Sequence, residues 1–197
     1  MIEIKYTGDA LWARIERAVE IVKERLRRVT ETLNIAGIPY AIFGGNAVQH
    51  WVSQVDESVV RNTRDVDIIL NRTDLPEAIT ALEKVGFNYR PSAGVTMFLD
   101  GPDAKARDAV HVVFAGEKVR DEYPEAVPNI DDYALMQNAR TLPFEALVRM
   151  KLTSFRDKDR VHLRDMVSIG MIDETWLDRL SPALGSRLQE LLGDPDG

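Results

Sequence analysis

The chain has 197 residues, of which 45% are hydrophobic, and it carries a formal net charge of −7 with no cysteine. The length and the hydrophobic share predict one domain with a real core, while the lack of cysteine excludes disulfides and thiolate metal sites. No apolar run is long enough for a membrane span, and the N-terminus lacks the charged-then-apolar layout of a signal peptide. We therefore expect a cytoplasmic protein with no membrane partner, and the negative charge argues against a surface devoted to nucleic acid.

The first predicted element is a long amphipathic helix over residues 9–36. Apolar residues recur there at steps of three and four with charged residues between them, which is the period of a helix with one buried face. Gly37 ends the helix and Pro39 prevents its continuation. The apolar positions are Leu11, Ile15, Val19, Val22, Leu26, Val29 and Leu33.

Two glycines, Gly44 and Gly45, follow a predicted apolar strand over residues 40–43 and precede a short helix over residues 47–52. A helix N-terminus presents backbone N–H groups that bind phosphate, and a Cβ at the second glycine would hold a phosphate away from the backbone. The alternative is a tight turn that serves no ligand. Because two aspartates follow on the next strand, we predict that Gly44 and Gly45 bind nucleotide phosphates.

Asp65 and Asp67 lie two residues apart in the next predicted strand, residues 65–70, after a polar loop over residues 53–64. Side chains at this spacing point to the same face of a strand. Two carboxylates side by side repel each other unless a cation lies between them, and Mg²⁺ prefers carboxylates, water and substrate phosphates. The alternative is an edge strand with solvated acids, although the apolar neighbours favour an interior strand. We predict a site for Mg²⁺ (or Mn²⁺) beside a nucleoside triphosphate.

The remaining elements predict an α+β fold, a mixed sheet flanked by helices with a helical C-terminal part. We expect a core with the long N-terminal helix over residues 1–125 and helices packed on it over residues 126–197. The predicted elements are a helix from 74 to 86, strands at 87–90, 95–100 and 109–114, an irregular connector at 117–132, and helices at 144–155, 158–169, 173–180 and 182–192.

These motifs resemble the nucleotidyltransferase superfamily with the DNA polymerase β-like fold. Its pattern is a Gly-Gly turn, a helix and then two aspartates on the next strand, as in Gly44-Gly45 and Asp65-Val66-Asp67. The chain is most similar to the small bacterial AbiEii-type proteins, which carry a Thr-x-Asp-x-Asp strand and a later helical Lys-Leu followed by Lys-Asp. The matching segments, within residues 39–165, are Thr63-Arg64-Asp65-Val66-Asp67, Lys151-Leu152 and Lys158-Asp159.

The resemblance implies a role for each matching residue. Asp65 and Asp67 would hold the metal, Thr63 would steady the loop or contact phosphate, and Lys151 would reach the triphosphate as a point charge. The alternative for Lys151 is a solvated surface residue, and for Lys158-Asp159 it is helix-end capping and surface ion pairs.

His111 departs from the superfamily pattern, which places a third carboxylate on a later strand between apolar residues. Here that strand reads Val110-His111-Val112. Alternation predicts that His111 faces the same cavity as Asp65 and Asp67. It would then act as a neutral imidazole base or a weak metal ligand, and the alternative is a half-buried structural histidine.

The resemblance implies metal-dependent transfer of a nucleoside monophosphate from a nucleoside triphosphate to a hydroxyl of RNA, protein or a small molecule. The missing third carboxylate keeps open a non-catalytic binding protein of the same fold, such as a toxin–antitoxin component. An interaction module built on the N-terminal helix is a third possibility, and the sequence leaves the oligomeric state open.

Overall fold

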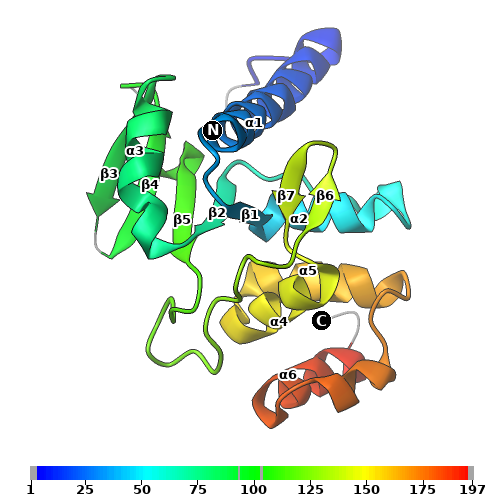
Figure 1. Ribbon diagram of the computed structural model, residues 1–197. Coiled ribbons are helices and arrows are strands. Elements are labelled where there is room, and N and C mark those ends of the chain that lie inside the picture. The colour runs from blue at the N-terminus through cyan, green and yellow to red at the C-terminus, as the bar shows by residue number, and fades with distance from the viewer. Residues whose placement is uncertain (1–3, 93, 103, 195–197) are drawn as a thin grey trace.

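One mixed sheet forms the centre of the protein (Figure 1). The structure, a computed structural model, describes residues 4–92, 94–102 and 104–194. Within these ranges seven strands pair in the order β3-β4-β5-β2-β1-β7-β6. The strands are β1 Tyr40–Phe43, β2 Val66–Leu70, β3 Phe87–Ser92, β4 Val95–Asp100, β5 Val110–Phe114, β6 Ala134–Met136 and β7 Ala139–Thr141.

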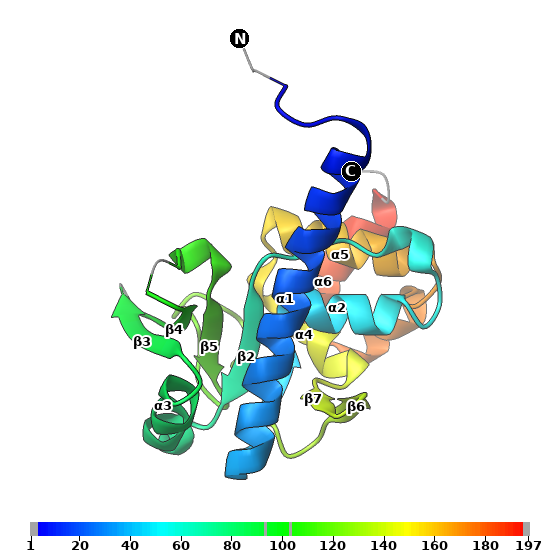
Figure 2. The ribbon, with the colours of Figure 1, turned by 90° about the horizontal axis from the view of Figure 1, so that it is seen from above.

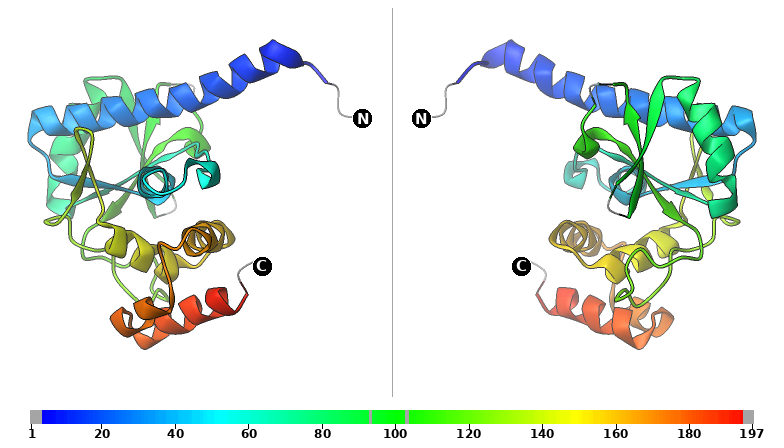
Figure 3. Two further views of the ribbon diagram at one scale, coloured as in Figure 1. Left: turned by 90° about the vertical axis from the view of Figure 1, so that its right-hand side faces the viewer. Right: turned by 90° about the vertical axis from the view of Figure 1, so that its left-hand side faces the viewer.

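Helices lie on both sides of this sheet, which confirms the α+β prediction. Helix α1 lies on one side, and α4, α5 and α6 stack on the other (Figure 3). None of the helices in the described ranges is long and apolar enough to cross a membrane. The helices are α1 Gly8–Ala36, α2 Gly44–Val52, α3 Leu75–Glu83, α4 Phe144–Ser154, α5 Asp157–Ser168 and α6 Pro182–Gly193.

Strands β1, β2 and β5 are the most buried part of the sheet, and they position the candidate site. Strand β1 is antiparallel to β2, and β2 is parallel to β5. Ile42 and Ile68 are completely buried in the core, as expected for strands with both faces covered. Polar side chains at the ends of β2 and β5 are therefore exceptions to an apolar pattern.

Helix α1 confirms the predicted N-terminal helix, and its two halves differ in their surroundings. Gly37 ends it with φ 71°, and its N–H donates to the carbonyls of Leu33 and Asn34. Val29 and Leu33 are fully buried, whereas Trp12 near the other end is 63% exposed. Figures 2 and 3 show this first half projecting past the rest of the molecule. The amphipathic period predicted the helix but not which turns of it find a partner.

The hairpin of β6 and β7 was not predicted from the sequence. Strand β7 pairs in parallel with β1, with Ile42 opposite Thr141, and Gln137 in the turn has φ 54°. Three-residue strands are too short to give a clear alternation. The part of the chain after residue 126 thus adds an edge to the sheet as well as helices, and the division at residue 125 stays a prediction.

Several predicted boundaries shift by a few residues. Strand β2 begins at Val66, so Asp65 precedes it, and α2 begins at Gly44 rather than Ala47. The helix predicted over residues 173–180 is a 3₁₀ helix, Glu174–Arg179.

Candidate active site

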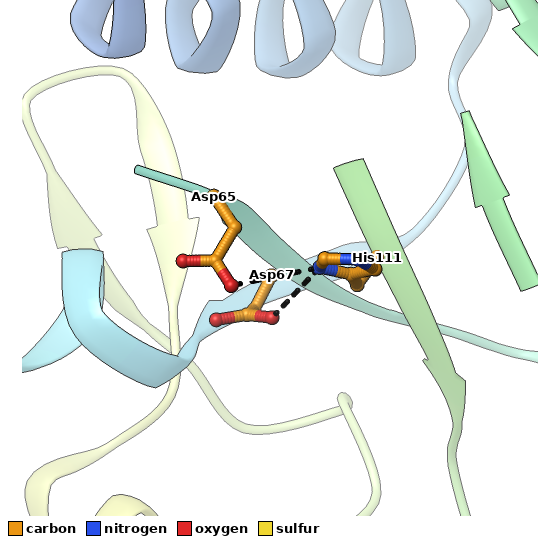
Figure 4. A group of neighbouring side chains, drawn as sticks. All are labelled: Asp65, Asp67 and His111. Carbon is orange, nitrogen blue, oxygen red and sulfur yellow. Dashed lines mark ion pairs between the residues drawn. The ribbon is translucent and has the colours of Figure 1, made fainter. Parts of the chain in front are cut away.

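Asp65, Asp67 and His111 come together where β2 and β5 begin (Figure 4). Parallel pairing places Asp67 directly opposite His111. His111 Nδ1 lies 3.7 Å from Asp65 Oδ2 and 3.7 Å from Asp67 Oδ1. All three side chains offer a ligand atom within 4.8 Å of the others, a spacing that suits one divalent cation. His111 thus points to the side of the aspartates, as strand alternation predicts.

The two nitrogens of the His111 ring have different surroundings. Nε2 lies 3.1 Å from the carbonyl oxygen of Ala106, and Nδ1 faces the carboxylates. The neighbouring Asp67 carboxylate raises the pKa of His111 above its usual value, although burial opposes this rise. The two aspartates therefore favour a proton on the ring, and a cation bound between them would displace it.

The Asp65 side chain and backbone are held on two sides. Thr63 Oγ1 donates to Asp65 Oδ1 at 2.9 Å, and Asn46 Nδ2 donates to the Asp65 carbonyl at 2.9 Å. Thr63 therefore steadies the loop through Asp65 itself, which is one of the two roles predicted for it. Asn46 was missed, since a single asparagine inside a short helix gives no distinctive pattern.

Arg25 of α1 holds the residue before Asp65, and sequence reasoning missed it too. Its Nη1 donates to the Arg64 carbonyl at 2.9 Å, and its Nε lies 3.2 Å from Asp100 Oδ2. Arg25 is only 5% exposed. A charged residue three positions after Val22, on the buried face of an amphipathic helix, was the available signal.

The two glycines make room for the site's own side chains. Gly44 has φ 66°, and a Cβ on it would lie 2.0 Å from Asp67 Oδ2. A Cβ on Gly45 would lie 2.8 Å from Thr63 Oγ1. Gly44 is needed both for its left-handed backbone and for its contact with Asp67. This close packing is a second reason for glycine, besides the predicted phosphate approach.

Lys151 and Asp159 form the centre of a second charged group, which we call the α4–α5 cluster and which also contains Ser154 and Arg156. Lys151 Nζ lies 3.1 Å from Asp159 Oδ1, and Ser154 Oγ and Arg156 Nε each lie 2.7 Å from Asp159 Oδ2. Lys151 is 4% and Asp159 2% exposed. The alternatives of a solvated lysine and of a surface ion pair for Asp159 are therefore wrong.

Burial and pairing act against each other in the α4–α5 cluster. Burial on its own would raise the pKa of Asp159, but Lys151 and Arg156 hold it at about 2. Burial also lowers the pKa of Lys151, against the opposite pull of Asp159. Asp159 is therefore ionised at neutral pH, and each partner depends on the other for compensation.

His162 lies on α5 beside this cluster and was read from the sequence as structural or surface. Its Nδ1 is buried and makes no hydrogen bond within the described residues. Burial, with the positive charge of Lys151, lowers the pKa of His162 to about 4. The ring is therefore neutral at physiological pH, in contrast to the raised pKa of His111.

One cavity of about 840 Å³ connects the two charged groups. Its wall includes Asp65, Asp67 and His111, and this volume is within the range of small-molecule sites. The other predicted site residues on the same wall are Gly44, Gly45, Thr63 and Lys151.

The sequence matches no protein-family profile and no curated protein. Its fold is similar to that of an antigenic nucleotidyltransferase-like protein from Paracoccidioides brasiliensis, with 17% identity over 91% of each chain and a TM-score of 0.54. It is also similar to ANT(2'')-Ia in complex with adenylyl-2''-tobramycin, with 13% identity over 85% of this chain and 97% of that one and a TM-score of 0.53. JHP933 from Helicobacter pylori is 16% identical over 92% of this chain and 76% of its own, with a TM-score of 0.53. The chain therefore has the mixed-sheet α+β fold of polymerase β-like nucleotidyltransferases.

Proposed function

We propose that this protein is a metal-dependent nucleotidyltransferase, which moves a nucleoside monophosphate from a nucleoside triphosphate to a hydroxyl group and releases pyrophosphate. The observation that carries the proposal is the group of Asp65, Asp67 and His111. Their ligand atoms lie within 4.8 Å of one another on the wall of a cavity of about 840 Å³. ANT(2'')-Ia, which has a similar fold, was solved in complex with adenylyl-2''-tobramycin, and this supports the reaction class.

Asp65 and Asp67 would hold a divalent cation, Mg²⁺ or Mn²⁺. Two carboxylates whose one ion-pair partner among the described residues is a histidine fit such an ion by charge and by distance. A bound ion supplies charge neutralisation for the phosphates during transfer. The chain supports this by fixing Asp65 in advance, through Thr63 and Asn46.

The N-terminus of α2 would seat the β- and γ-phosphates. Helix α2 begins at Gly44, beside Asp67, so its first backbone N–H groups lie next to the proposed metal site. Lys151 would contribute its positive charge from inside the cavity wall. Its ammonium group is already bound to Asp159, so it acts as a fixed charge rather than as a free arm.

The acceptor is a hydroxyl of RNA, a protein or a small molecule. The Thr63-Arg64-Asp65-Val66-Asp67 segment and Lys151 support kinship with the small bacterial AbiEii-type proteins. The lack of cysteine supports a cytoplasmic location. The second candidate function is a non-catalytic member of the same fold, such as a toxin–antitoxin component. The observation that favours it is His111, which stands where the superfamily has its third carboxylate.

Thermal unfolding with each nucleoside triphosphate and Mg²⁺ or Mn²⁺ tests the metal site. Ligand at about one hundred times its Kd stabilises a folded protein by about 2.7 kcal/mol, and we expect a corresponding rise in Tm. The double variant D65N/D67N should lose this rise. The control is D131N/D132N, which removes the same charge from two exposed aspartates and should keep it.

Incubation with labelled nucleotides, total RNA and cell lysate separates the two candidate functions. Label transferred to an acceptor by the wild type and not by D65N/D67N supports the enzyme. A metal-dependent Tm rise without any transferred label supports the binding protein. An unchanged Tm rise in D65N/D67N would mean that the metal lies elsewhere.

A further inference from the structure

The hydrogen bond between His111 and Ala106 fixes which ring nitrogen carries the proton. A carbonyl oxygen has no proton to give, so Nε2, at 3.1 Å from it, must be the donor. The lone pair of the neutral imidazole is therefore on Nδ1. Since Nδ1 is the nitrogen that faces Asp65 and Asp67, the backbone holds His111 in the tautomer of a metal ligand.

The distances around Nδ1 suit coordination better than base catalysis. Nδ1 lies 3.7 Å from a carboxylate oxygen of Asp65 and 3.7 Å from one of Asp67. Ligands about 2.1 Å from one ion lie about 3–4 Å apart, depending on the angle between them. The three ligand atoms already have nearly this spacing without any rearrangement of the strands.

A general base needs a free nitrogen within hydrogen-bond reach of the acceptor hydroxyl. In His111, Nε2 is bound to the Ala106 carbonyl, and the free lone pair of Nδ1 faces the two carboxylates that would hold the cation rather than an acceptor hydroxyl. Of the two roles predicted for His111, the geometry favours the ligand.

We propose that His111 Nδ1 completes a ligand set of two carboxylates and one imidazole, and that this set selects Mn²⁺ or another first-row transition-metal ion over Mg²⁺. The inference rests on the metal site of the proposed function and deepens it. Imidazole is a ligand for transition metals, whereas Mg²⁺ prefers oxygen and gives up water reluctantly. A third carboxylate in place of His111 would suit Mg²⁺ and Mn²⁺ alike and would remove this preference.

Electron paramagnetic resonance of Mn²⁺ bound to the wild-type protein tests the ligand directly. Spin-echo spectroscopy detects modulation from a nitrogen nucleus coordinated to Mn²⁺, and we expect this modulation in the wild type. It should disappear in H111Q. The control is H162Q, which removes the other cavity histidine and should leave the modulation unchanged.

Competition between Mn²⁺ and Mg²⁺ tests the selectivity. We expect the wild type to bind Mn²⁺ more tightly than Mg²⁺, because an imidazole ligand suits transition-metal ions. H111D should still bind Mn²⁺ without nitrogen modulation, and its preference for Mn²⁺ should fall by about tenfold.

Bound Mn²⁺ without nitrogen modulation in the wild type would overturn the proposal and leave the carboxylate metal site standing. Equal affinity for the two ions in the wild type would overturn the selectivity. Loss of the modulation in H162Q would mean that the coordinating nitrogen belongs to His162, and this would overturn the assignment to His111. Unchanged Mn²⁺ binding in D65N/D67N, by contrast, would remove the metal site of the proposed function. The wild-type spectrum needs no variant, so the test holds even if H111Q does not fold.

Discussion

The two charged groups on the cavity wall differ in how completely the protein compensates them. In the α4–α5 cluster, the Asp159 carboxylate receives Lys151, Arg156 and Ser154, and its side chain is almost fully buried. Asp65 and Asp67 face one histidine between them and remain partly open to the cavity. We call the α4–α5 cluster the complete group, because its charges are paired within the protein. We call Asp65, Asp67 and His111 the open group, because they have capacity left for a ligand.

The compensation has opposite consequences for substitution in the two groups. Removing one partner from a buried ion pair leaves an uncompensated charge, which is costly. Removing one of two neighbouring carboxylates relieves repulsion and costs little fold stability. Metal affinity should respond in the reverse order: substitutions at Asp65 or Asp67 should lower it strongly, and substitutions in the α4–α5 cluster should lower it little.

The largest expected effect is on Asp159. D159N leaves the buried Lys151 ammonium without its carboxylate, and we expect the free energy of unfolding to fall by about 3–5 kcal/mol in urea titration. D67N without metal should cost less than about 1 kcal/mol. Similar losses in the two variants would abolish the distinction between the groups.

A control on the same helix separates the buried pair from helix α5 in general. The Asp165 side chain is 12% exposed and accepts from Arg61, whose side chain is 55% exposed, so D165N leaves behind a solvated cation rather than a buried one. We expect a loss of about 1 kcal/mol or less. A loss as large as that of D159N would point to the helix rather than to the Lys151 pair.

Gly44→Ala should have the next largest effect, because the added Cβ would displace Asp67 in the open group. The left-handed backbone costs roughly 1–2 kcal/mol for alanine, and the collision with Asp67 adds about 1–3 kcal/mol. Mn²⁺ affinity should fall as well, since Asp67 must move. Urea titration and Mn²⁺ titration measure the two effects.

Gly37→Ala is the matched control, with φ 71° and nothing within 4 Å of the added Cβ. It should show only the backbone cost and should bind Mn²⁺ like the wild type. Equal stability losses in the two variants would mean that Asp67 adapts without cost.

Arg25 should affect the open group from a distance. R25Q removes the donor to the Arg64 carbonyl next to Asp65, and we expect Mn²⁺ affinity to fall by about tenfold, as for other outer partners of metal ligands. R28Q is the control, because Arg28 also binds Asp100 but contacts the Val85 carbonyl instead. If both variants lower Mn²⁺ affinity equally, the effect comes from Asp100 and not from the Arg64 carbonyl.

The smallest expected effect concerns His162 at the complete group. Its folded pKa of about 4 lies below the usual 6.5, so the unfolded chain binds a proton that the folded chain does not. The contribution of His162 to the free energy of unfolding should be constant above pH 6.5 and should fall as the pH drops towards 4. The slope of the free energy of unfolding against pH should correspond to the uptake of at most one proton on unfolding. Urea titrations across this window should give a flatter profile for H162Q, and an identical profile would contradict the neutral, buried ring.

The sequence by itself determined the elements whose pattern is local. The apolar period of α1, the Gly44-Gly45 turn and the spacing of Asp65 and Asp67 each depend on residues close together in the chain, and so they predicted the fold class and the open group. Alternation along β5 also predicted where His111 points, since it depends only on the strand.

Only the tertiary structure decided which charges are buried and which segments meet. The sequence around Lys151 does not show whether Asp159, eight residues later, contacts its side chain. The burial of Lys151 could therefore not be predicted from the sequence. Arg25 reaches the Arg64 carbonyl across 39 positions, and Thr141 of β7 pairs with Ile42 of β1 across 99 positions. Partners this distant leave no periodic trace in a single sequence, because their spacing is set by the packing of the whole sheet and its helices.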